Sequence, residues 1–598
     1  MGPISYLGRE FFYLKELLRV TREVGWIKPD SETLTPDHLE EIVDQHRDLP
    51  VFITETGEIS YAEYDAYANR VAHWALGQGL KPGDTVAIFL TNRWEYIALW
   101  YGLSKVGVVA ALVNYQLRGA SLAHCLSISG ASKVILEDEL KDAFDSACDE
   151  IDCEMAPWYL DRTPATEGAG DFDEAIAGQP ADRPSREHRA NLRARDACLK
   201  MYTSGTTGMP KAAPLAHTRV MYYLNIFSAG CKAGPGDRMF MVLPLYHSTG
   251  GLCGVGCAIS RGGALIVRKK FSASLFWDEV QRYRATLFMY VGELCRFLLS
   301  TPPNPAEDDH DIRCIIGNGL RPDIWVEFQK RFAIPRIMEF YGATEGNVGL
   351  VNLDSKPGAI GRIPPWLEWR FNVALAAFDY ATEQPVRGPD GFCRKAEPGE
   401  VGEAIGRIDP NDTRFRFEGY QNKEETAKKI LHDVFEKGDA WFRTGDLMKR
   451  DKAGYFYFVD RVGDTFRWRS ENVSTNEVAE AIGRFAGVQQ ANVYGVEVPG
   501  YPGRAGMAAL VVAPDFDLAG LRAHIHEALP AYARPVFIRL QQETDTTGTF
   551  KFRKVDLVKQ GYDPKTVKDP LWFDDDQKGY IALKPALFTA INDGTKRL

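Results

Sequence analysis

The strongest constraint on how this chain folds is a loop rich in glycine and hydroxyl side chains that directly follows an apolar stretch. Residues 197–202 form the apolar stretch, and residues 203–211 read Thr-Ser-Gly-Thr-Thr-Gly-Met-Pro-Lys. In open α/β sheets, ligands bind at the carboxyl ends of strands, where this loop is expected to lie. The glycines allow backbone N–H groups to curl around an anion, and the hydroxyls and a lysine add donors. The sequence therefore predicts an α/β fold with a phosphate-binding loop.

The loop differs from two familiar nucleotide motifs. A Walker A loop needs four residues between its glycines and then Gly-Lys-Ser/Thr, whereas here two residues separate Gly205 from Gly208 and Pro210 precedes Lys211. The loop does not match G-x-G-x-x-G either. A polar surface turn is the alternative interpretation. The residues predicted to bind phosphate are Thr203, Ser204, Gly205, Thr206, Thr207, Gly208 and Lys211.

Strand and helix patterns alternate along the chain. Ser60-Tyr-Ala-Glu63 is a capping box that opens a helix, and residues 85–90 read as a buried strand. Residues 93–106 are helical in pattern, and residues 107–113 are a second apolar strand. This alternation predicts a parallel sheet covered on both faces. Residues 161–196, rich in Pro, Gly, Asp and Arg, are expected to form a surface excursion.

The length of 598 residues exceeds what one compact core accommodates. After about residue 461 the alternation restarts on a smaller scale, so we expect an N-terminal domain of residues 1–460 and a C-terminal domain of residues 461–598. The net charge of −10 argues against a nucleic acid bound through bulk positive charge. The ten cysteines include no C-x-x-C pair, and Cys253 and Cys257 are expected to be buried thiols in a reducing compartment.

Residues 203–211 resemble the phosphate-loop signature of the adenylate-forming enzymes, which comprise acyl-CoA synthetases, peptide-synthetase adenylation domains and luciferases. Residues 464–474, 290–296 and 547–551 resemble the fatty acid transport protein/very-long-chain acyl-CoA synthetase branch of that superfamily. The resemblance covers nearly the whole chain. It implies a large N-terminal AMP-binding domain with parallel-sheet subdomains and a small mobile α+β C-terminal lid, with ATP, Mg²⁺ and coenzyme A as cofactor and co-substrates.

A second loop supplies the groups that a nucleotide site needs. Tyr341, Thr344 and Glu345 offer a flat ring for the base, a hydroxyl for the α-phosphate and a carboxylate for Mg²⁺. The resemblance gives the matching positions these roles, so Glu345 is the predicted metal ligand and Gly342 part of the nucleotide site. A strand-to-helix turn is the alternative. Gly317, Asn318 and Gly319 resemble the adenine-side loop, although Gly-Asn-Gly is also an ordinary tight turn.

Three further positions gain roles from the resemblance. Asp446 would accept hydrogen bonds from both ribose hydroxyls and Arg461 would reach the same ribose; a structural salt bridge is the alternative. His247 would border the carboxylate pocket, and a core histidine explains it nearly as well. Residues 290–296 and 249–256 would line the acyl channel, where the glycines could equally serve helix packing.

Lys551 matches the C-terminal lysine motif of the family, and the resemblance makes it the predicted catalytic lysine. A cation that bridges the attacking carboxylate and the α-phosphate would stabilise the adenylation transition state. Lys554 is the competing candidate, and a solvated basic face is the alternative for both. By resemblance, the small domain rotates on a hinge between acyl-adenylate formation and attack by the thiol of coenzyme A. Gly463 stands where the family has its hinge Asp or Lys. Ser470 stands where the family has the glycine beside which pantetheine passes.

Residues 4–20 carry an apolar helical stripe with charges opposite. Such a helix either docks on the protein's own core or lies in a membrane interface. No apolar run is long enough to span a bilayer. We therefore expect a cytoplasmic protein. Peripheral contact with the inner face of a membrane, through residues 4–20, is a second possibility.

The predicted function is ATP-dependent ligation of long- or very-long-chain fatty acids to coenzyme A, coupled in one version to fatty acid uptake. Two alternatives stay open. One is a CoA ligase for another carboxylic acid: bile-acid-like, carnitine-like or aromatic. The other is a membrane-associated fatty acid carrier that acts without catalysis.

Overall fold

The computed structural model describes residues 3–152, 154–161, 170–203, 209–343, 346–380, 382–409, 415–417, 419, 423–469, 471–543 and 554–598. The chain divides into two compact units, each described below by itself. The first comprises residues 1–320, 328–356 and 408–430, and the second comprises residues 321–327, 357–407 and 431–598. The second unit thus includes residues on both sides of position 460, and the predicted two-domain boundary there stays a prediction.

The first unit contains a seven-stranded sheet in the order β7-β6-β5-β3-β4-β8-β9, in which only the β8–β9 pair is antiparallel. Every residue of β3 is buried, as expected for a strand covered on both faces. The strands are β3 (Thr85–Phe89), β4 (Val109–Leu112), β5 (Ala131–Glu137), β6 (Ala156–Leu160), β7 (Gly170–Asp171), β8 (Ala197–Thr203) and β9 (Lys211–Ala216).

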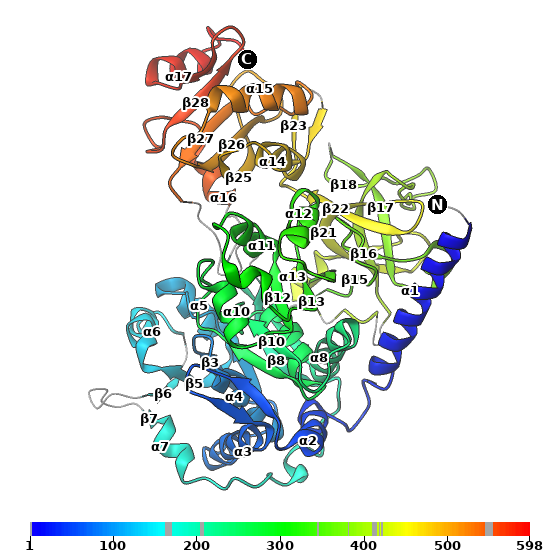
Figure 1. Ribbon diagram of the computed structural model, residues 1–598, viewed down its shortest axis with the longest axis vertical. Coiled ribbons are helices and arrows are strands. Elements are labelled where there is room, and N and C mark those ends of the chain that lie inside the picture. Colours follow the sequence, from blue (N-terminus) through cyan, green and yellow to red (C-terminus); the bar gives the residue numbers. More distant parts are fainter. Residues whose placement is uncertain are drawn as a thin grey trace. The chain divides into compact units, whose positions relative to one another are not determined.

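A second sheet of the same unit has eight strands in the order β15-β14-β13-β12-β10-β11-β1-β2. Its six central strands are parallel, and Figure 1 shows β10, β12 and β13 side by side. The strands are β1 (Pro50–Ile53), β2 (Glu58–Ser60), β10 (Arg238–Met241), β11 (Ala264–Val267), β12 (Leu287–Val291), β13 (Cys314–Asn318), β14 (Ile337–Gly342) and β15 (Gly349–Asn352). The two sheets confirm the predicted parallel α/β architecture.

Helices of the first unit begin where the sequence supplies caps. Ser60 and Glu63 form the expected reciprocal capping box of α3, and Gly130 ends α5 in the left-handed conformation. The helices are α1 (Pro3–Val24), α2 (Thr35–His46), α3 (Tyr61–Gly77), α4 (Trp94–Lys105), α5 (Gly119–Ser129), η1 (Asp138–Leu140), α6 (Lys141–Cys148), α7 (Phe172–Ala177), η2 (Arg186–Arg189), α8 (His217–Cys231), η3 (Thr249–Gly254), α9 (Val255–Ile259), α10 (Phe276–Arg282), α11 (Gly292–Leu299), η4 (Pro305–Asp308) and α13 (Lys423–Ala427). α12 (Pro322–Arg331) has residues in both units.

The N-terminal helix α1 docks on the protein along one face, as one of the two sequence expectations stated; the other, contact with a membrane interface, stays a prediction. Its buried side chains Tyr13, Glu16 and Val20 form one face, and a carboxylate oxygen of Glu16 lies 3.0 Å from Nζ of Lys232 directly after α8. The opposite face leaves Leu7, Phe11 and Leu18 65, 72 and 61% exposed. The helix is therefore attached to the protein along one side and apolar toward solvent along the other.

The segment 161–196 is less superficial than the sequence suggested. Phe172 is fully buried, and Arg189 is buried with its guanidinium donating to Asp37 at 2.8 Å and to Glu40 at 3.3 Å. Carboxylates on α2 therefore hold η2, the end of this segment, against the protein. Cys253 and Cys257 are buried, and burial raises the pKa of both thiols.

The second unit begins with a mostly antiparallel sheet in the order β16-β22-β21-β19-β17-β18, with β20 beside β21. These strands are β16 (Gly361–Arg362), β17 (Val373–Asp379), β18 (Gln384–Pro385), β19 (Val401–Arg407), β20 (Ile430–His432), β21 (Ala440–Arg450) and β22 (Tyr455–Arg461); η5 (Pro365–Arg370) follows β16.

The rest of the second unit has the small α+β character that the sequence predicted. A five-stranded sheet in the order β25-β26-β27-β28-β29 buries a core that includes Val493, Leu510, Phe537 and Phe573. The elements are the hairpin β23 (Phe466–Trp468) and β24 (Glu471–Val473), then α14 (Thr475–Gly483), β25 (Val488–Val496), β26 (Ala505–Val512), α15 (Leu518–Ala528), β27 (Phe537–Gln541), α16 (Lys554–Gln560), β28 (Leu571–Asp575), β29 (Gly579–Ala582) and α17 (Pro585–Asn592).

Within the described ranges, none of the helices combines the length and apolarity that crossing a bilayer requires.

Candidate active site

The eight-stranded sheet brings several predicted site residues to one edge. Gly317 and Asn318 end β13, and Tyr341 and Gly342 end β14. His247 lies in the loop that follows β10. Because β10, β12, β13 and β14 are parallel, their carboxyl ends point to the same edge of the sheet. This is the edge at which open α/β sheets bind ligands.

The turn Gly317–Gly319, the predicted adenine-side loop, depends on glycine because two stretches of backbone pass each other at very short range. A Cβ on Gly317 would lie 2.1 Å from the carbonyl oxygen of Tyr290, and a Cβ on Gly292 would lie 1.7 Å from that of Gly319. Gly319 itself has φ +76°, a value that side chains rarely tolerate. The Gly-Asn-Gly turn is therefore packed against the Tyr290–Gly292 segment and presents backbone where a side chain would otherwise stand.

The loop after Tyr341 is held by two residues that the sequence analysis did not single out. Arg219 of α8 donates from Nη1 to the carbonyl oxygen of Gly346 at 2.6 Å. Tyr223, one turn later, donates its hydroxyl to the carbonyl oxygen of Ala343 at 3.4 Å. Their i, i+4 spacing places both on one face of α8, a signal that becomes informative only when the neighbouring loop is known.

His247 is half-buried in the loop that leads into η3. Its Nδ1 accepts a hydrogen bond from the backbone N–H of Thr249 at 3.4 Å, which orients the ring. A Cβ on Gly251 would lie 2.0 Å from the carbonyl oxygen of Leu245, so this turn, too, is closed by glycine. Both readings of His247, pocket residue and structural residue, are compatible with this geometry.

The predicted phosphate loop lies between two paired strands, β8 and β9. Thr203 and Lys211 are register partners at the end of the antiparallel β8–β9 pair, and Lys211 is half-buried. The loop therefore leaves the carboxyl end of β8, as predicted.

Several predicted residues lie outside the described part of the chain: Ser204, Gly205, Thr206, Thr207, Gly208, Thr344, Glu345, Ser470 and Lys551. The side chain of Thr203 is likewise not described. Their roles stay predictions.

In the second unit, Asp446 and Arg461 are opposite each other on β21 and β22. The distance from Nε of Arg461 to Oδ1 of Asp446 is 3.6 Å, a loose ion pair, and the backbone N–H of Asp446 donates to the hydroxyl of Thr444 at 3.0 Å. The structural pairing expected as the alternative is thus present. Gly463 follows with φ +89°, which suits a pivot residue.

Lys554, the competing catalytic candidate, has protein partners in the same unit. Its Nζ donates to the hydroxyl of Thr475 at 2.6 Å and lies 3.5 Å from a carboxylate oxygen of Asp464. A lysine held in this way has a structural role in this arrangement.

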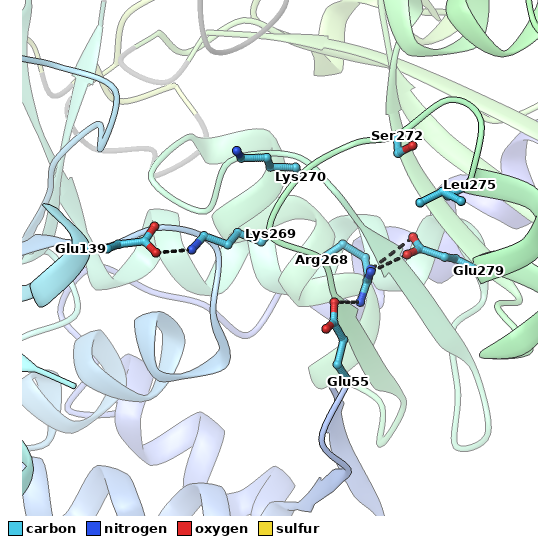
Figure 2. A pocket seen from close by; sticks show the side chains of 8 residues that line it. All are labelled: Glu55, Glu139, Arg268, Lys269, Lys270, Ser272, Leu275 and Glu279. Atoms are coloured by element: carbon cyan, nitrogen blue, oxygen red, sulfur yellow. Dashed lines mark hydrogen bonds and ion pairs between the residues drawn. The ribbon is translucent and has the colours of Figure 1, made fainter.

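A separate open pocket of about 460 Å³ lies in the first unit, where β11 ends (Figure 2). Arg268 pairs with Glu55 at 2.7 Å and also with Glu279, and Lys269 pairs with Glu139 at 2.5 Å. Positive and negative side chains line it in equal number, and it contains none of the predicted site residues: its lining is Glu55, Glu139, Arg268, Lys269, Lys270, Ser272, Leu275 and Glu279. The pocket is distinct from the candidate active site.

Comparison with known proteins assigns the family. The AMP-binding enzyme model matches residues 39–402, and the AMP-binding enzyme C-terminal domain model matches residues 477–551. The chain is 39% identical over 605 residues to long-chain fatty acid transport protein 2 of Rattus norvegicus, covering 99% of this chain and 96% of that protein. It is 37% identical over 594 residues to long-chain fatty acid transport protein 6 of Mus musculus, covering 98% and 95%.

Among solved structures, ATP-bound MatB from Rhodopseudomonas palustris resembles the chain with a TM-score of 0.73 and 23% identity, over 88% of this chain and 99% of that one. This likeness supports the fold. The family models match the same superfamily that the loop motifs indicated. The chain belongs to the AMP-binding enzyme family and, within the adenylate-forming superfamily, to the branch of the long-chain fatty acid transport proteins and very-long-chain acyl-CoA synthetases.

Proposed function

We propose that the chain ligates long- or very-long-chain fatty acids to coenzyme A in two steps, through an acyl-adenylate. The observation that carries the proposal is the placement of the adenine-side loop and Tyr341 at the ends of adjacent parallel strands in a chain of this branch. MatB was solved with ATP bound, and we propose the same co-substrate here.

The described residues offer surfaces suited to the nucleoside part of ATP. The glycine-closed turn of Gly317–Gly319 gives a flat backbone surface, and Tyr341 gives an aromatic ring on the neighbouring strand. We propose that Asp446 accepts from the ribose hydroxyls. The phosphate contacts are assigned to residues 203–211, the Mg²⁺ contact to Glu345 and the contact with pantetheine to Ser470, all as proposals.

In the first step, the proposed role of Lys551 is to hold the fatty carboxylate against the α-phosphate while pyrophosphate leaves. Thr344 would donate to the same phosphate. In the second step, the thiol of coenzyme A attacks the acyl carbon, and AMP leaves. His247, whose ring is oriented by Thr249, is proposed to border the reacting carboxylate.

A panel of acids tests the proposal. Purified protein is assayed for exchange of labelled pyrophosphate into ATP with palmitate, longer fatty acids, benzoate, a bile acid and a carnitine-like acid. Acyl-CoA and AMP are then measured with and without coenzyme A. Fatty acids should give the fastest exchange and equal amounts of AMP and acyl-CoA. Preference for benzoate or a bile acid would select the alternative ligase, and exchange with none of the acids would reject the proposal.

We further propose that the protein contacts membranes peripherally through α1, with the body of the protein on the cytoplasmic side. The supporting observation is the exposed face of α1, which carries Leu7, Phe11 and Leu18 together with Lys15 and Arg22. Apolar side chains interspersed with cations suit the interface of an anionic bilayer. A carrier function without catalysis remains the competing proposal and is separated from ligation by the Lys551 variant described below.

A further inference from the structure

We propose that Glu339 and Tyr290 are positioning residues for nucleotide binding, because together they hold the loop Gly317–Leu320 in the shape that receives the adenine. The inference rests on the proposed function and concerns the same site. It assigns a role to Glu339, a carboxylic side chain in the middle of an otherwise apolar strand.

Glu339 connects three adjacent strands of the eight-stranded sheet. It lies on β14, is 2% exposed, and is the register partner of Gly317 on β13. One carboxyl oxygen, Oε1, accepts a hydrogen bond from the backbone N–H of Leu320 at 3.1 Å. The other, Oε2, accepts from the hydroxyl of Tyr290 on β12. The side chain therefore ties the end of the adenine-side loop to the neighbouring strand.

Tyr290 supports the same loop in two ways. Its hydroxyl binds Glu339, while its carbonyl oxygen and ring leave no room for a Cβ on Gly317. Two residues later, Gly292 lies directly against the carbonyl group of Gly319. The segment Tyr290–Gly292 thus fixes the loop in two ways. Its backbone packs against Gly317 and Gly319, and the Tyr290 hydroxyl binds Glu339, which in turn binds Leu320.

The position of Glu339 also relates the loop to Tyr341. Residues two apart on a strand project to the same face, so Glu339 and Tyr341 share a face of β14. The strand that carries the proposed stacking ring therefore also carries the group that positions the opposing backbone. Loss of the Glu339 contacts should loosen the surface that faces the base and leave the acyl side of the reaction unaffected.

A role limited to stability predicts a different outcome. If the buried Tyr–Glu pair only satisfied polar groups, altering it would lower the melting temperature. The ratio of the KM for ATP to the KM for palmitate would then stay unchanged. The decisive readout is therefore ATP affinity, measured by calorimetry without acid, together with the KM values for ATP and palmitate.

The variants are Tyr290→Phe, Glu339→Leu and Glu339→Gln, with Tyr64→Phe as the matched control. Tyr64 is fully buried on α3, and among the described residues its hydroxyl has no hydrogen-bond partner. Tyr64→Phe thus removes the same atom from a buried tyrosine away from the loop. Glu339→Gln keeps a carbonyl acceptor for Leu320 and a polar group for Tyr290.

Tyr290→Phe should weaken ATP binding roughly tenfold, the loss expected for one hydrogen bond, and Glu339→Leu, which removes two hydrogen bonds, should weaken it at least as much. KM for palmitate should change less than twofold in both variants. Glu339→Gln and Tyr64→Phe should stay within twofold of the wild type. If Tyr290→Phe binds ATP like the wild type, or alters both KM values equally, the inference is wrong even where Glu339→Leu fails to fold. Absence of ATP binding by the wild type would instead reject the proposed function.

Discussion

The carboxylate of Asp460, in β22, accepts hydrogen bonds from both the backbone N–H and the hydroxyl of Thr475, the first residue of α14, at 2.7 and 2.9 Å. The same carboxylate accepts from the side chain of Asn476 at 3.0 Å. Asp460 precedes the predicted pivot at Gly463, and Thr475 follows it. One buried side chain therefore connects the segments on both sides of the pivot.

Replacing Asp460 by Ala should loosen α14, because the first backbone N–H of the helix, that of Thr475, loses its acceptor. The hydroxyl of Thr475 also loses the acceptor for its proton, although it still accepts from Lys554. We expect a loss of about 2–4 kcal/mol in the free energy of unfolding and faster proteolysis within residues 461–475. Chemical denaturation and limited proteolysis measure both effects. Glu480→Gln, which alters the surface pair of Glu480 with Arg484, should change stability by no more than about 0.5 kcal/mol. An Asp460→Ala variant as stable and as protease-resistant as this control would contradict the prediction.

Replacing Lys551 by Ala should lower pyrophosphate exchange about 10²- to 10³-fold, because a cation that stabilises the developing charge is lost. Lys554→Ala should cost less than tenfold, since Nζ of Lys554 is engaged by Thr475. Exchange kinetics on both variants decide between the two lysines, and a larger loss for Lys554→Ala would reverse the assignment. Fatty acid uptake measured in cells carrying Lys551→Ala separates ligation from carriage: uptake that survives would favour the carrier.

Lys105 should be among the most sensitive buried positions. Its Nζ lies 2.9 Å from Glu40 and 2.8 Å from Asp65, with all three side chains nearly inaccessible. Burial lowers the pKa of Lys105, while the two carboxylates act in the opposite direction. Lys105→Met leaves both carboxylates with one cation fewer and should cost about 3–5 kcal/mol.

The control for Lys105 makes the same change on the surface. Lys141 pairs with Asp145 one helical turn away on α6, where both side chains are well exposed. Lys141→Met should lower the free energy of unfolding far less than Lys105→Met does, because exposed ion pairs contribute little. Urea denaturation of the two variants tests the difference, and equal losses would show that burial does not govern the energetics of these pairs.

Glu339 should make stability fall as pH rises. Burial raises the pKa of this carboxyl to about 8 from an ordinary 4.5, although the hydrogen bond from Tyr290 acts to lower it. Between these values the native state retains a proton that the unfolded state has lost, so unfolding free energy decreases by up to about 1.4 kcal/mol for each pH unit. Tyr290 on β12 and Cys295 on α11 face the carboxyl, and burial raises the pKa of both, so neither should ionise in this window.

Glu339→Gln cannot titrate and should remove this contribution. Denaturation of wild type and variant at about pH 5, 6, 7 and 8 should therefore show the variant gaining stability relative to the wild type as pH increases. Parallel curves for the two proteins would mean that Glu339 ionises at its ordinary pKa.

The exposed face of α1 should bind anionic vesicles. Replacing Leu7, Phe11 and Leu18 by Ser removes most of the apolar area on this face and should weaken binding at least about tenfold. Co-sedimentation with phosphatidylcholine vesicles, with and without phosphatidylserine, measures it. Leu275→Ser, at another exposed leucine of the same unit, should leave binding unchanged. Equal binding by the triple variant and the wild type would rule out α1 as the contact.

The sequence allowed us to predict the strands, helices and helix starts, because local residue patterns determine them. Alternating apolar strands and capped helices indicated the parallel sheets, and the capping box at Ser60 marked the start of α3 correctly. Residues Gly317–Gly319 were interpreted as an adenine-side loop or a tight turn, and the packing of Tyr290 and Gly292 against them was not predicted.

Contacts between side chains far apart in the sequence could not be predicted from local residue patterns. Arg189 sits in a polar, proline-rich stretch and gave no sign of burial, because its carboxylate partners Asp37 and Glu40 are about 150 positions away. Glu339 and Arg219 were missed for the same reason: their significance depends on loops contributed by other strands. The catalytic role of Lys551 stays a prediction.

The contact between Gly292 and Gly319 has a consequence for protein engineering. A Cβ on Gly292 would lie 1.7 Å from the carbonyl oxygen of Gly319, so the start of α11 and the turn after β13 fit each other only without side chains, although 26 residues separate the two glycines. A chimera that takes one of these segments from a relative should therefore take the other from the same relative, so that the two backbone segments still pack together.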